Sequence, residues 1–314
     1  MKSTAGYLVQ KVIAGRDLNI HAEKYRVGNI EGWFSVIGNF FLALAKMGLG
    51  LFIGSIALMA DAVHTASDIS SSLAVLVGFR LSRKKADQEH PFGHGRIEYM
   101  TSLIMALMLI ATGLMFIYTA YLRLQAGTAA EPNLPAFGIV IFSIWFKNMM
   151  FHFSLQLGKL IQSEALIADA WHHRSDAFSS AVVLIALIGS HFNIVWLDGA
   201  FGIFVALFVV YAGLAIAHKS ISRLLGIAPD PEFIEGVIHC ARQVAGVIGA
   251  HDLTVHDYGF FKSMTLHIEV DESLSVANAH KIAQSVEQHI GQTYSCSAVV
   301  HLDPGKPKNT KGNQ

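Results

Sequence analysis

Long apolar stretches occupy most of the first 226 residues and predict helices that cross a lipid bilayer. A helical span needs about 20 mostly apolar residues. Two windows reach this length without a charged residue, at Tyr99–Leu122 and Gly199–Ala217. Four other windows are apolar but contain ionisable side chains, at 32–54, 57–80, 136–158 and 164–190. The pattern therefore predicts an all-α membrane bundle of six helices.

After Gly226 the pattern changes to that of a smaller domain with helices and strands. Apolar residues recur at helical spacing over 232–246 and 275–291. Short apolar runs predict three strands, at 252–257, 264–270 and 298–301. The resulting order, αββαβ, predicts an α+β domain. We expect four parts: an N-terminal extension at 1–30, a six-span transmembrane domain at 31–226, the α+β domain at 227–305 and a disordered tail at 306–314.

Lysine and arginine residues gather beside one end of the predicted spans. Lys24 and Arg26 precede the first span and residues 83–85 follow the second, whereas 191–198 contain no lysine or arginine. Basic residues close to span ends mark the cytoplasmic side. We therefore expect an integral protein of the inner or plasma membrane with both termini in the cytoplasm.

Composition agrees with a membrane protein and limits its partners. Hydrophobic residues make up 53% of the 314 positions and charged residues only 15%, against about 25% charged in an average soluble domain. The 23 basic and 23 acidic residues balance, which argues against a nucleic-acid partner because that requires a basic domain or stripe. Two cysteines exclude a disulfide framework. Sixteen histidines are the unusual feature, and imidazole is a common metal ligand.

A nine-residue motif occurs twice inside the predicted spans. Ala60–Asp68 and Ala168–Asp176 align without gaps at an offset of 108 residues and share six of nine residues. Each copy has a histidine followed four residues later by an aspartate, which places both on one helix face. Ionisable groups within a span are costly and indicate a functional site. Two such helices side by side form a four-ligand cage from His64, Asp68, His172 and Asp176.

Nitrogen and oxygen donors in a tetrahedral set favour Zn²⁺, and the absence of cysteine ligands argues against Cu⁺. Asp61 and Asp169 precede the histidines by three residues, and we expect them to orient these ligands. Arg174 and His173 are expected to face away. The alternatives are that the repeated residues form hydrogen bonds across helices, line a water crevice or relay protons.

Two further groups of candidate ligands lie outside the spans. Asp87, His90 and His94 follow the second span at a spacing that lets them reach one ion, although the same residues also fit a solvated polar loop. The last domain contains many histidines, of which His301 stands out because it shares a strand face with Asp303.

These motifs resemble those of the cation diffusion facilitators, whose bacterial members are homodimeric zinc/proton antiporters with six spans and a cytoplasmic metallochaperone-like domain. The resemblance covers residues 30–305. It depends on five segments: GSIALMADAVHTASD ending at Asp68, HPFGHGRIE at 90–98, ADAWHHRSD at 168–176, GAHDL at 249–253 and VVHLDP at 299–304.

The resemblance implies three kinds of metal site. The transport site matches His64, Asp68, His172 and Asp176. The loop site matches Asp87, His90 and His94. The cytoplasmic sites at the dimer interface match His251, His267, His280, His301 and Asp303.

Two features do not follow the resemblance. In zinc antiporters of this type, the basic residue matching Arg96 pairs across the dimer with an acid after the sixth span. The matching position here is Gly226, and the nearest acid is Asp230. Lys46, inside the first predicted span, has no partner that the sequence reveals.

The expected function is efflux of a divalent metal, with Zn²⁺ as the preferred substrate. The metal is expected to pass through the cage by alternating access in a homodimer, with protons as the counter-ion. Metal and protons exclude one another because a metal needs neutral imidazole and ionised carboxylate. Zinc at the loop and cytoplasmic sites is expected to regulate transport, and Cd²⁺, Fe²⁺, Co²⁺ and Mn²⁺ stay open as substrates. The alternatives are an intramembrane metalloenzyme that activates water and a metal-sensing membrane scaffold that does not transport.

Overall fold

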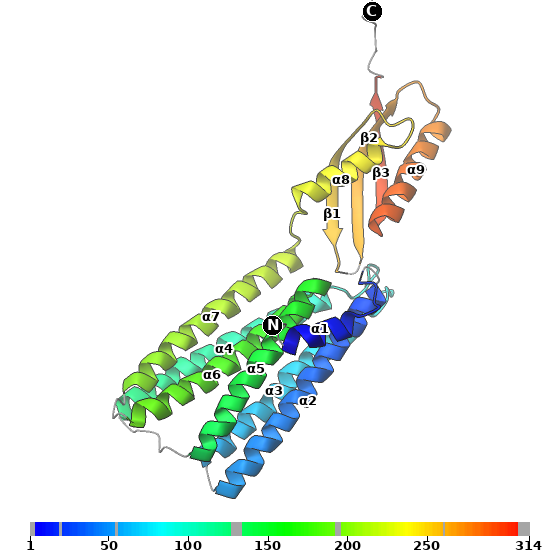
Figure 1. Ribbon diagram of the computed structural model, residues 1–314. Helices are drawn as coiled ribbons and strands as arrows, with labels where there is room; N and C mark the ends of the chain where they lie inside the picture. The colour runs from blue at the N-terminus through cyan, green and yellow to red at the C-terminus, as the bar shows by residue number, and fades with distance from the viewer. Residues whose placement is uncertain are drawn as a thin grey trace, which may run out of the picture. The chain divides into compact units, whose positions relative to one another are not determined.

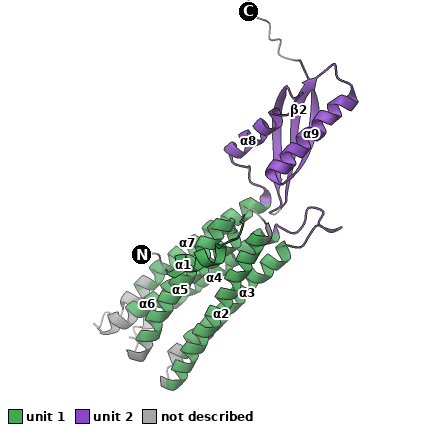
Figure 2. Ribbon diagram, turned by 45° about the vertical axis from the view of Figure 1, so that its right-hand side comes forward, with its two compact units in different colours: residues 1–83, 97–224 green, residues 84–96, 225–314 purple. Residues whose placement is uncertain are grey.

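The computed structural model describes residues 4–18, 21–53, 56–126, 134–191, 196–259 and 261–306. The chain forms two compact units, shown in different colours in Figure 2. The first unit comprises residues 1–83 and 97–224, and the second comprises residues 84–96 and 225–314. The loop that follows the second predicted span therefore belongs to the second unit.

The first unit is built from helices that run side by side (Figure 1). Its described helices are α1 (Thr4–Ile13), α2 (His21–Ile53), α3 (Ile56–Ser82), α4 (Ile97–Ala126), α5 (Leu134–Ile161), α6 (Glu164–His191) and α7 (Trp196–Leu225). Helices α2 to α7 stand at the six predicted positions, so the predicted six-helix bundle is confirmed. The short helix α1 lies inside the predicted N-terminal extension, where it buries Ala5 and Val9 in the same core as α5 and α6.

Five helices of the described residues are long and apolar enough to cross a membrane: Glu23–Phe52, Asp61–Ser82, Ile97–Leu122, Phe137–Ile161 and Gly202–Leu225. Helix α6 is 28 residues long but carries most of the ionisable groups of the repeated motif. Large apolar side chains such as Phe41, Leu107 and Phe204 are exposed on the bundle. In lipid this is the stable arrangement, because apolar side chains face the acyl chains while helices satisfy their own backbone.

The structure gives Lys46 a partner. Its ammonium lies 2.8 Å from Asp61 Oδ2 and donates a hydrogen bond to Thr65 Oγ1 at 2.9 Å. The Lys46 side chain is buried at 3% exposure, whereas that of Asp61 is 37% exposed. A buried charge is strongly destabilising without a paired charge, so this ion pair explains how a lysine is accommodated within the first span.

The second unit is a three-stranded sheet covered on one face by two helices. Its elements are α8 (Pro231–Arg242), β1 (Gly249–Asp257), β2 (Lys262–Asp271), α9 (Val276–Tyr294) and β3 (Ser297–Gly305). The strand order is β1-β2-β3, with β1 antiparallel and β3 parallel to β2. The predicted αββαβ order is confirmed. Helix α8 ends at Arg242 rather than 246, shortly before Gly246 at φ +96°, a conformation that favours glycine.

Alternation along β2 separates the two faces of this sheet. Met264, Leu266 and Ile268 are fully buried under α8 and α9, which also contact each other through the rings of Phe233 and Tyr294. Residues between them point to the opposite face, because successive strand side chains alternate. The uncovered face therefore receives the histidines of the strands.

The loop at 84–96 is held to this unit by an aromatic cluster. The Phe92 ring stacks on Tyr258 with centroids 4.5 Å apart, and the Arg96 guanidinium lies 4.3 Å from the same Tyr258 centroid. Arg96 Nε also donates a hydrogen bond to the Asp257 carbonyl at 3.2 Å. Arg96 thus has partners within its own chain, Asp257 and Tyr258, instead of depending on an acid after the sixth span.

Candidate metal centres

The structure brings the four residues of the repeated motif together. His172 Nε2 on α6 lies 3.7 Å from Asp68 Oδ1 on α3 and 3.8 Å from Asp176 Oδ2 on α6. His64, Asp68 and Asp176 offer ligand atoms within 4.8 Å of one another. Asp68, His172 and Asp176 are buried, whereas His64 is exposed. His64, Asp68 and Asp176 can converge on one cation, and His172 lies beside the two carboxylates.

Lys147 on α5 contributes a side chain to the cage that the sequence analysis does not assign. Its Nζ donates to Asp68 Oδ2 at 2.8 Å and to Asp176 Oδ2 at 2.6 Å, with all three side chains almost fully buried. The ammonium therefore bridges two carboxylates that a metal would also bind. The sequence signal was a single lysine inside an apolar span, which by itself predicts an acidic partner.

Polar atoms of the cage lack partners within the described part of the chain. His172 Nδ1 and Nε2 and Asp176 Oδ1 are buried and accept or donate no hydrogen bond there. Buried polar groups in native proteins are nearly always satisfied. Unsatisfied ligand atoms beside two carboxylates are typical of a site that binds a cation other than the Lys147 ammonium.

The two aspartates that precede the motif histidines have other partners than predicted. Asp61 pairs with Lys46, and Asp169 Oδ2 lies 3.1 Å from His173 Nε2. The prediction that Asp169 orients His172 is wrong because His173 stands four residues from Asp169, the spacing at which helical side chains meet most readily. His173 faces away from the cage, as predicted, toward Ser35 of α2.

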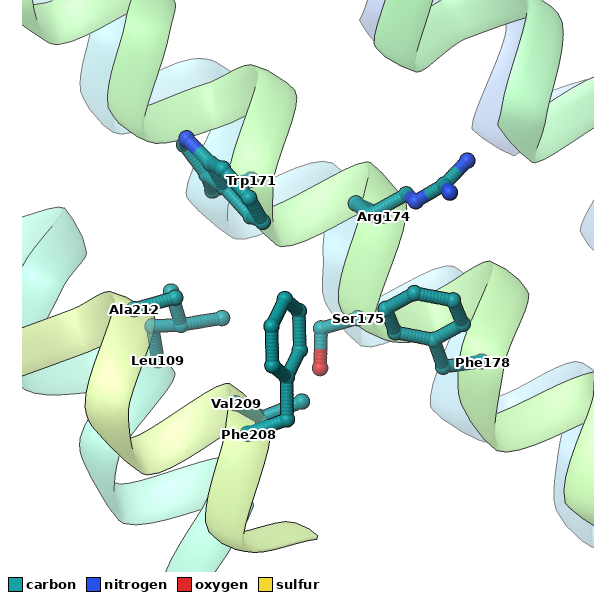
Figure 3. Close-up of a pocket in the computed structure, with 8 residues that line it drawn as sticks. All are labelled: Leu109, Trp171, Arg174, Ser175, Phe178, Phe208, Val209 and Ala212. Atoms are coloured by element: carbon teal, nitrogen blue, oxygen red, sulfur yellow. The ribbon is translucent and has the colours of Figure 1, made fainter. Parts of the chain in front are cut away.

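Arg174 also faces away from the cage. Its guanidinium lies 4.9 Å from the Phe151 ring centroid and 4.7 Å from that of Phe178, and it donates to Asn148 Oδ1 at 2.5 Å. Figure 3 shows it beside a pocket between α4, α6 and α7. The pocket is mainly apolar and is lined by Leu109, Trp171, Arg174, Ser175, Phe178, Phe208, Val209 and Ala212. Its lining has no carboxylate, imidazole or thiol.

The loop residues also meet. Asp87 Oδ1 lies 3.4 Å from His90 Nδ1, and Asp87 Oδ2 lies 3.5 Å from His94 Nε2. Gly93 has φ +81° and its N–H bonds to the His90 carbonyl, which closes the turn. Lys84 Nζ donates to Asp87 Oδ2 at 2.7 Å, and this bond lowers the pKa of Asp87.

Four of the five predicted cytoplasmic ligands meet on the uncovered sheet face. His267 Nδ1 lies 2.9 Å from Asp303 Oδ2, His251 Nε2 lies 3.5 Å from the same oxygen, and His301 Nε2 lies 3.6 Å from Asp303 Oδ1. The pairing of β2 with both neighbours places His267 between His251 and His301. The hydrogen bond with His267 lowers the pKa of Asp303, which keeps this carboxylate ionised for metal binding.

The remaining residues near this group were not equally visible in the sequence. Glu269 Oε1 lies 3.7 Å from His251 Nε2 and was not predicted, although its spacing of two from His267 on one strand was the available signal. His280 is exposed on α9, the helix that covers the opposite sheet face. The structure therefore does not bring His280 to the other four ligands within one chain.

Comparison with known proteins identifies the family. A family model described as the cation efflux transmembrane domain matches residues 32–225, and one described as the cation efflux protein cytoplasmic domain matches residues 229–305. The chain belongs to the cation diffusion facilitator, or cation efflux, family. As such it is an integral membrane protein that exports divalent cations. The metalloenzyme alternative is thereby excluded.

Three relatives of this cation diffusion facilitator illustrate its similarity to known proteins, and the name of one of them, a manganese efflux protein, gives a metal. It is 36% identical over 270 residues to the uncharacterized transporter MJ0449 of Methanocaldococcus jannaschii, covering 86% of this chain and 95% of that one. It is 32% identical to metal tolerance protein C1 of Arabidopsis thaliana, covering 90% of this chain and 65% of the relative. It is 26% identical to the manganese efflux system protein MneP of Bacillus subtilis, and the match covers 90% of this chain and 98% of the relative.

Removal of the Lys84 ammonium tests whether Asp87 is a metal ligand. In Lys84→Met, the pKa of Asp87 rises toward its ordinary value of about 3.9 but Asp87 stays ionised at pH 7. We therefore expect the loop to bind Zn²⁺ more tightly, by up to about fivefold for an exposed ion pair, with the gain lost at high salt.

Lys85→Met is the matched control, because it removes the same charge one residue further along. Isothermal titration of Zn²⁺ into the two full-length variants measures the difference. Equal affinity in both would contradict the assignment of Asp87 as a ligand with which Lys84 competes.

Proposed function

We propose that this cation diffusion facilitator exports Zn²⁺ from the cytoplasm in exchange for protons, by alternating access in a homodimer. The transport site is the cage of His64, Asp68, His172 and Asp176. The observation that carries this proposal is the convergence of two buried carboxylates and a buried imidazole from α3 and α6, with the exposed His64 beside the carboxylates.

The donor set supports zinc over the other metals. Two imidazoles and two carboxylates give the nitrogen and oxygen ligands of a tetrahedral Zn²⁺ site, whereas Mn²⁺ prefers sites made mainly of oxygen ligands. Fe²⁺, Co²⁺ and Cd²⁺ accept similar donors, so transport of each is compared directly with that of zinc.

Lys147 adds a step to the exchange of metal for protons. Zn²⁺ binds Asp68 and Asp176 only when the ammonium releases both oxygens. The empty carrier then keeps a positive charge between its acids, because Lys147 returns as the metal leaves. Protons on the histidines compete with metal for the nitrogen ligands. The site thus alternates between a divalent metal and a lysine with accompanying protons.

The second unit supports regulation by zinc in a dimer. The match to the cytoplasmic domain of cation efflux proteins supports homodimerisation. His251, His267, His301 and Asp303 form a cluster on the uncovered sheet face, and the exposed His280 is available to a second chain. Metal at this cluster and at the loop stabilises the transport-competent dimer. Both termini then lie in the cytoplasm, beside the basic span ends.

Zinc flux with a proton readout tests the transport proposal. Proteoliposomes that contain the full-length protein and an internal pH dye should take up Zn²⁺ while protons move in the opposite direction. Asp176→Ala removes a ligand and a partner of Lys147, so we expect at least a 100-fold loss of flux, at or beyond the about 10–100-fold that loss of an outer-shell partner costs. Lys159→Met on α5 is the control for altered charge.

Persistent zinc uptake in Asp176→Ala would contradict the cage, and uptake without opposing proton movement would contradict the antiport. Flux of Mn²⁺ at the same rate as Zn²⁺ would remove the proposed selectivity. Metal binding without any flux would support the scaffold alternative instead.

Lys147→Met tests the competition between lysine and metal. Because the ammonium no longer occupies the carboxylates, we expect the cage to bind Zn²⁺ at least about tenfold more tightly, a change of about 1.4 kcal/mol. Flux should fall, since the empty cage loses its counter-charge and releases metal slowly. Titration is made in a chain whose loop and cytoplasmic sites are disabled by Asp87→Ala and His267→Ala. Weaker zinc binding than in the Lys147 parent would contradict this role.

A further inference from the structure

A second group of ionisable side chains is buried in the first unit, beside the cage but on other faces of the helices. Glu31 on α2 and Asp169 and His173 on α6 offer ligand atoms within 4.8 Å of one another. All three residues are 0% exposed. Ser35 on α2 and Ser154 on α5 place hydroxyl groups against them. The group therefore connects three helices inside the membrane domain.

The spacing of the donor atoms fits a small divalent cation. His173 Nε2 lies 3.1 Å from Asp169 Oδ2, and Ser35 Oγ lies 3.3 Å from both Asp169 Oδ2 and Glu31 Oε1. Zinc–ligand bonds of 2.0–2.2 Å place neighbouring donors of a tetrahedron about 3.3–3.6 Å apart. The separations among Ser35, Asp169 and His173, 2.8–3.3 Å, lie close to this spacing, and the Glu31 carboxylate lies within 4.8 Å of the other ligand atoms.

The charges of this group also point to a cation. Within the described part of the chain, the recorded partners of Glu31 and Asp169 are hydroxyl groups, an imidazole and each other, whereas the cage acids share the Lys147 ammonium. Glu31 Oε2, Asp169 Oδ1 and His173 Nδ1 are buried with no hydrogen-bond partner there. Two adjacent buried acids are costly to ionise together, and a divalent ion that binds both removes that cost.

We propose that Glu31, Asp169, His173 and Ser35 form a second intramembrane site for a divalent cation with nitrogen and oxygen ligands, such as Zn²⁺. This inference goes beyond the proposed function, which uses only the cage. Helix α6 supplies ligands to both sites, and the adjacent rings of His172 and His173 are 6.1 Å apart. An ion at the second site therefore fixes the rotation of the helix that carries half of the cage.

The two sites can be disabled separately, because each takes ligands from a helix that contributes none to the other site. Glu31→Gln changes only α2 and removes a ligand of the second site. His64→Ala with Asp68→Asn changes only α3 and disables the cage. Bound Zn²⁺ per chain is counted in the full-length protein by equilibrium dialysis and elemental analysis. We expect either change to remove one zinc and the combination to remove two.

Glu164→Gln is the matched control, because it removes another buried glutamate of the same unit, one that pairs with Lys219. It should keep the full zinc count. Glu31→Asp retains a carboxylate, and we expect it to keep the second zinc with weaker affinity.

Three results decide the inference. An unchanged zinc count in Glu31→Gln, with and without the cage, would overturn it. Loss of zinc from every site in both Glu31→Gln and Glu31→Asp would also overturn it, since that outcome assigns Glu31 a purely structural role. Loss of one zinc only in the cage variant supports the cage and rejects the second site, so the two proposals fail independently.

Discussion

Two carboxylates at the centre of an apolar helix bundle impose the constraint on which the rest of this molecule depends. Asp68 and Asp176 are 4% and 5% exposed, and an ionised acid in a membrane interior requires a positive partner. Lys147 supplies that partner from α5, at hydrogen-bond distance from both. A divalent metal can also compensate the negative charge of these two acids, with one more positive charge than the lysine. In the proposed mechanism, transport depends on which cation, Lys147 or metal, the two acids hold.

The proposed competition between a lysine and a metal for carboxylates applies to an exposed site as well as to a buried one. Lys84 pairs with Asp87 in the exposed loop as Lys147 pairs with the buried cage acids. The exposed pair is screened by water and salt, so it modulates affinity only slightly, whereas the buried pair decides whether the site is available at all. Where Glu31 and Asp169 lie without a lysine partner among the described residues, a metal has less to displace. Burial and available counter-charge thus distinguish the sites.

The order of elements and the grouping of most candidate ligands could be predicted from the sequence, because both depend on local periodicity. The repeated motif places His172 and Asp176 on one helix face, and strand alternation places His301 with Asp303. The helix partners were not predictable in this way. Lys147 and Glu31 lie far from the motif in sequence, and only the packing of α2 and α5 against α6 brings them to it. Asp169 was assigned to the wrong histidine because two adjacent imidazoles lie within its reach.

The central claim is that metal and Lys147 use the same carboxylates in turn. A zinc-loaded structure of the full-length protein, with anomalous scattering measured at the zinc edge, tests it most directly. We expect a zinc peak among His64, Asp68, His172 and Asp176, with the Lys147 ammonium moved out of hydrogen-bond distance from both acids. A zinc peak elsewhere in the membrane domain, with Lys147 still bonded to Asp68 and Asp176, would contradict it.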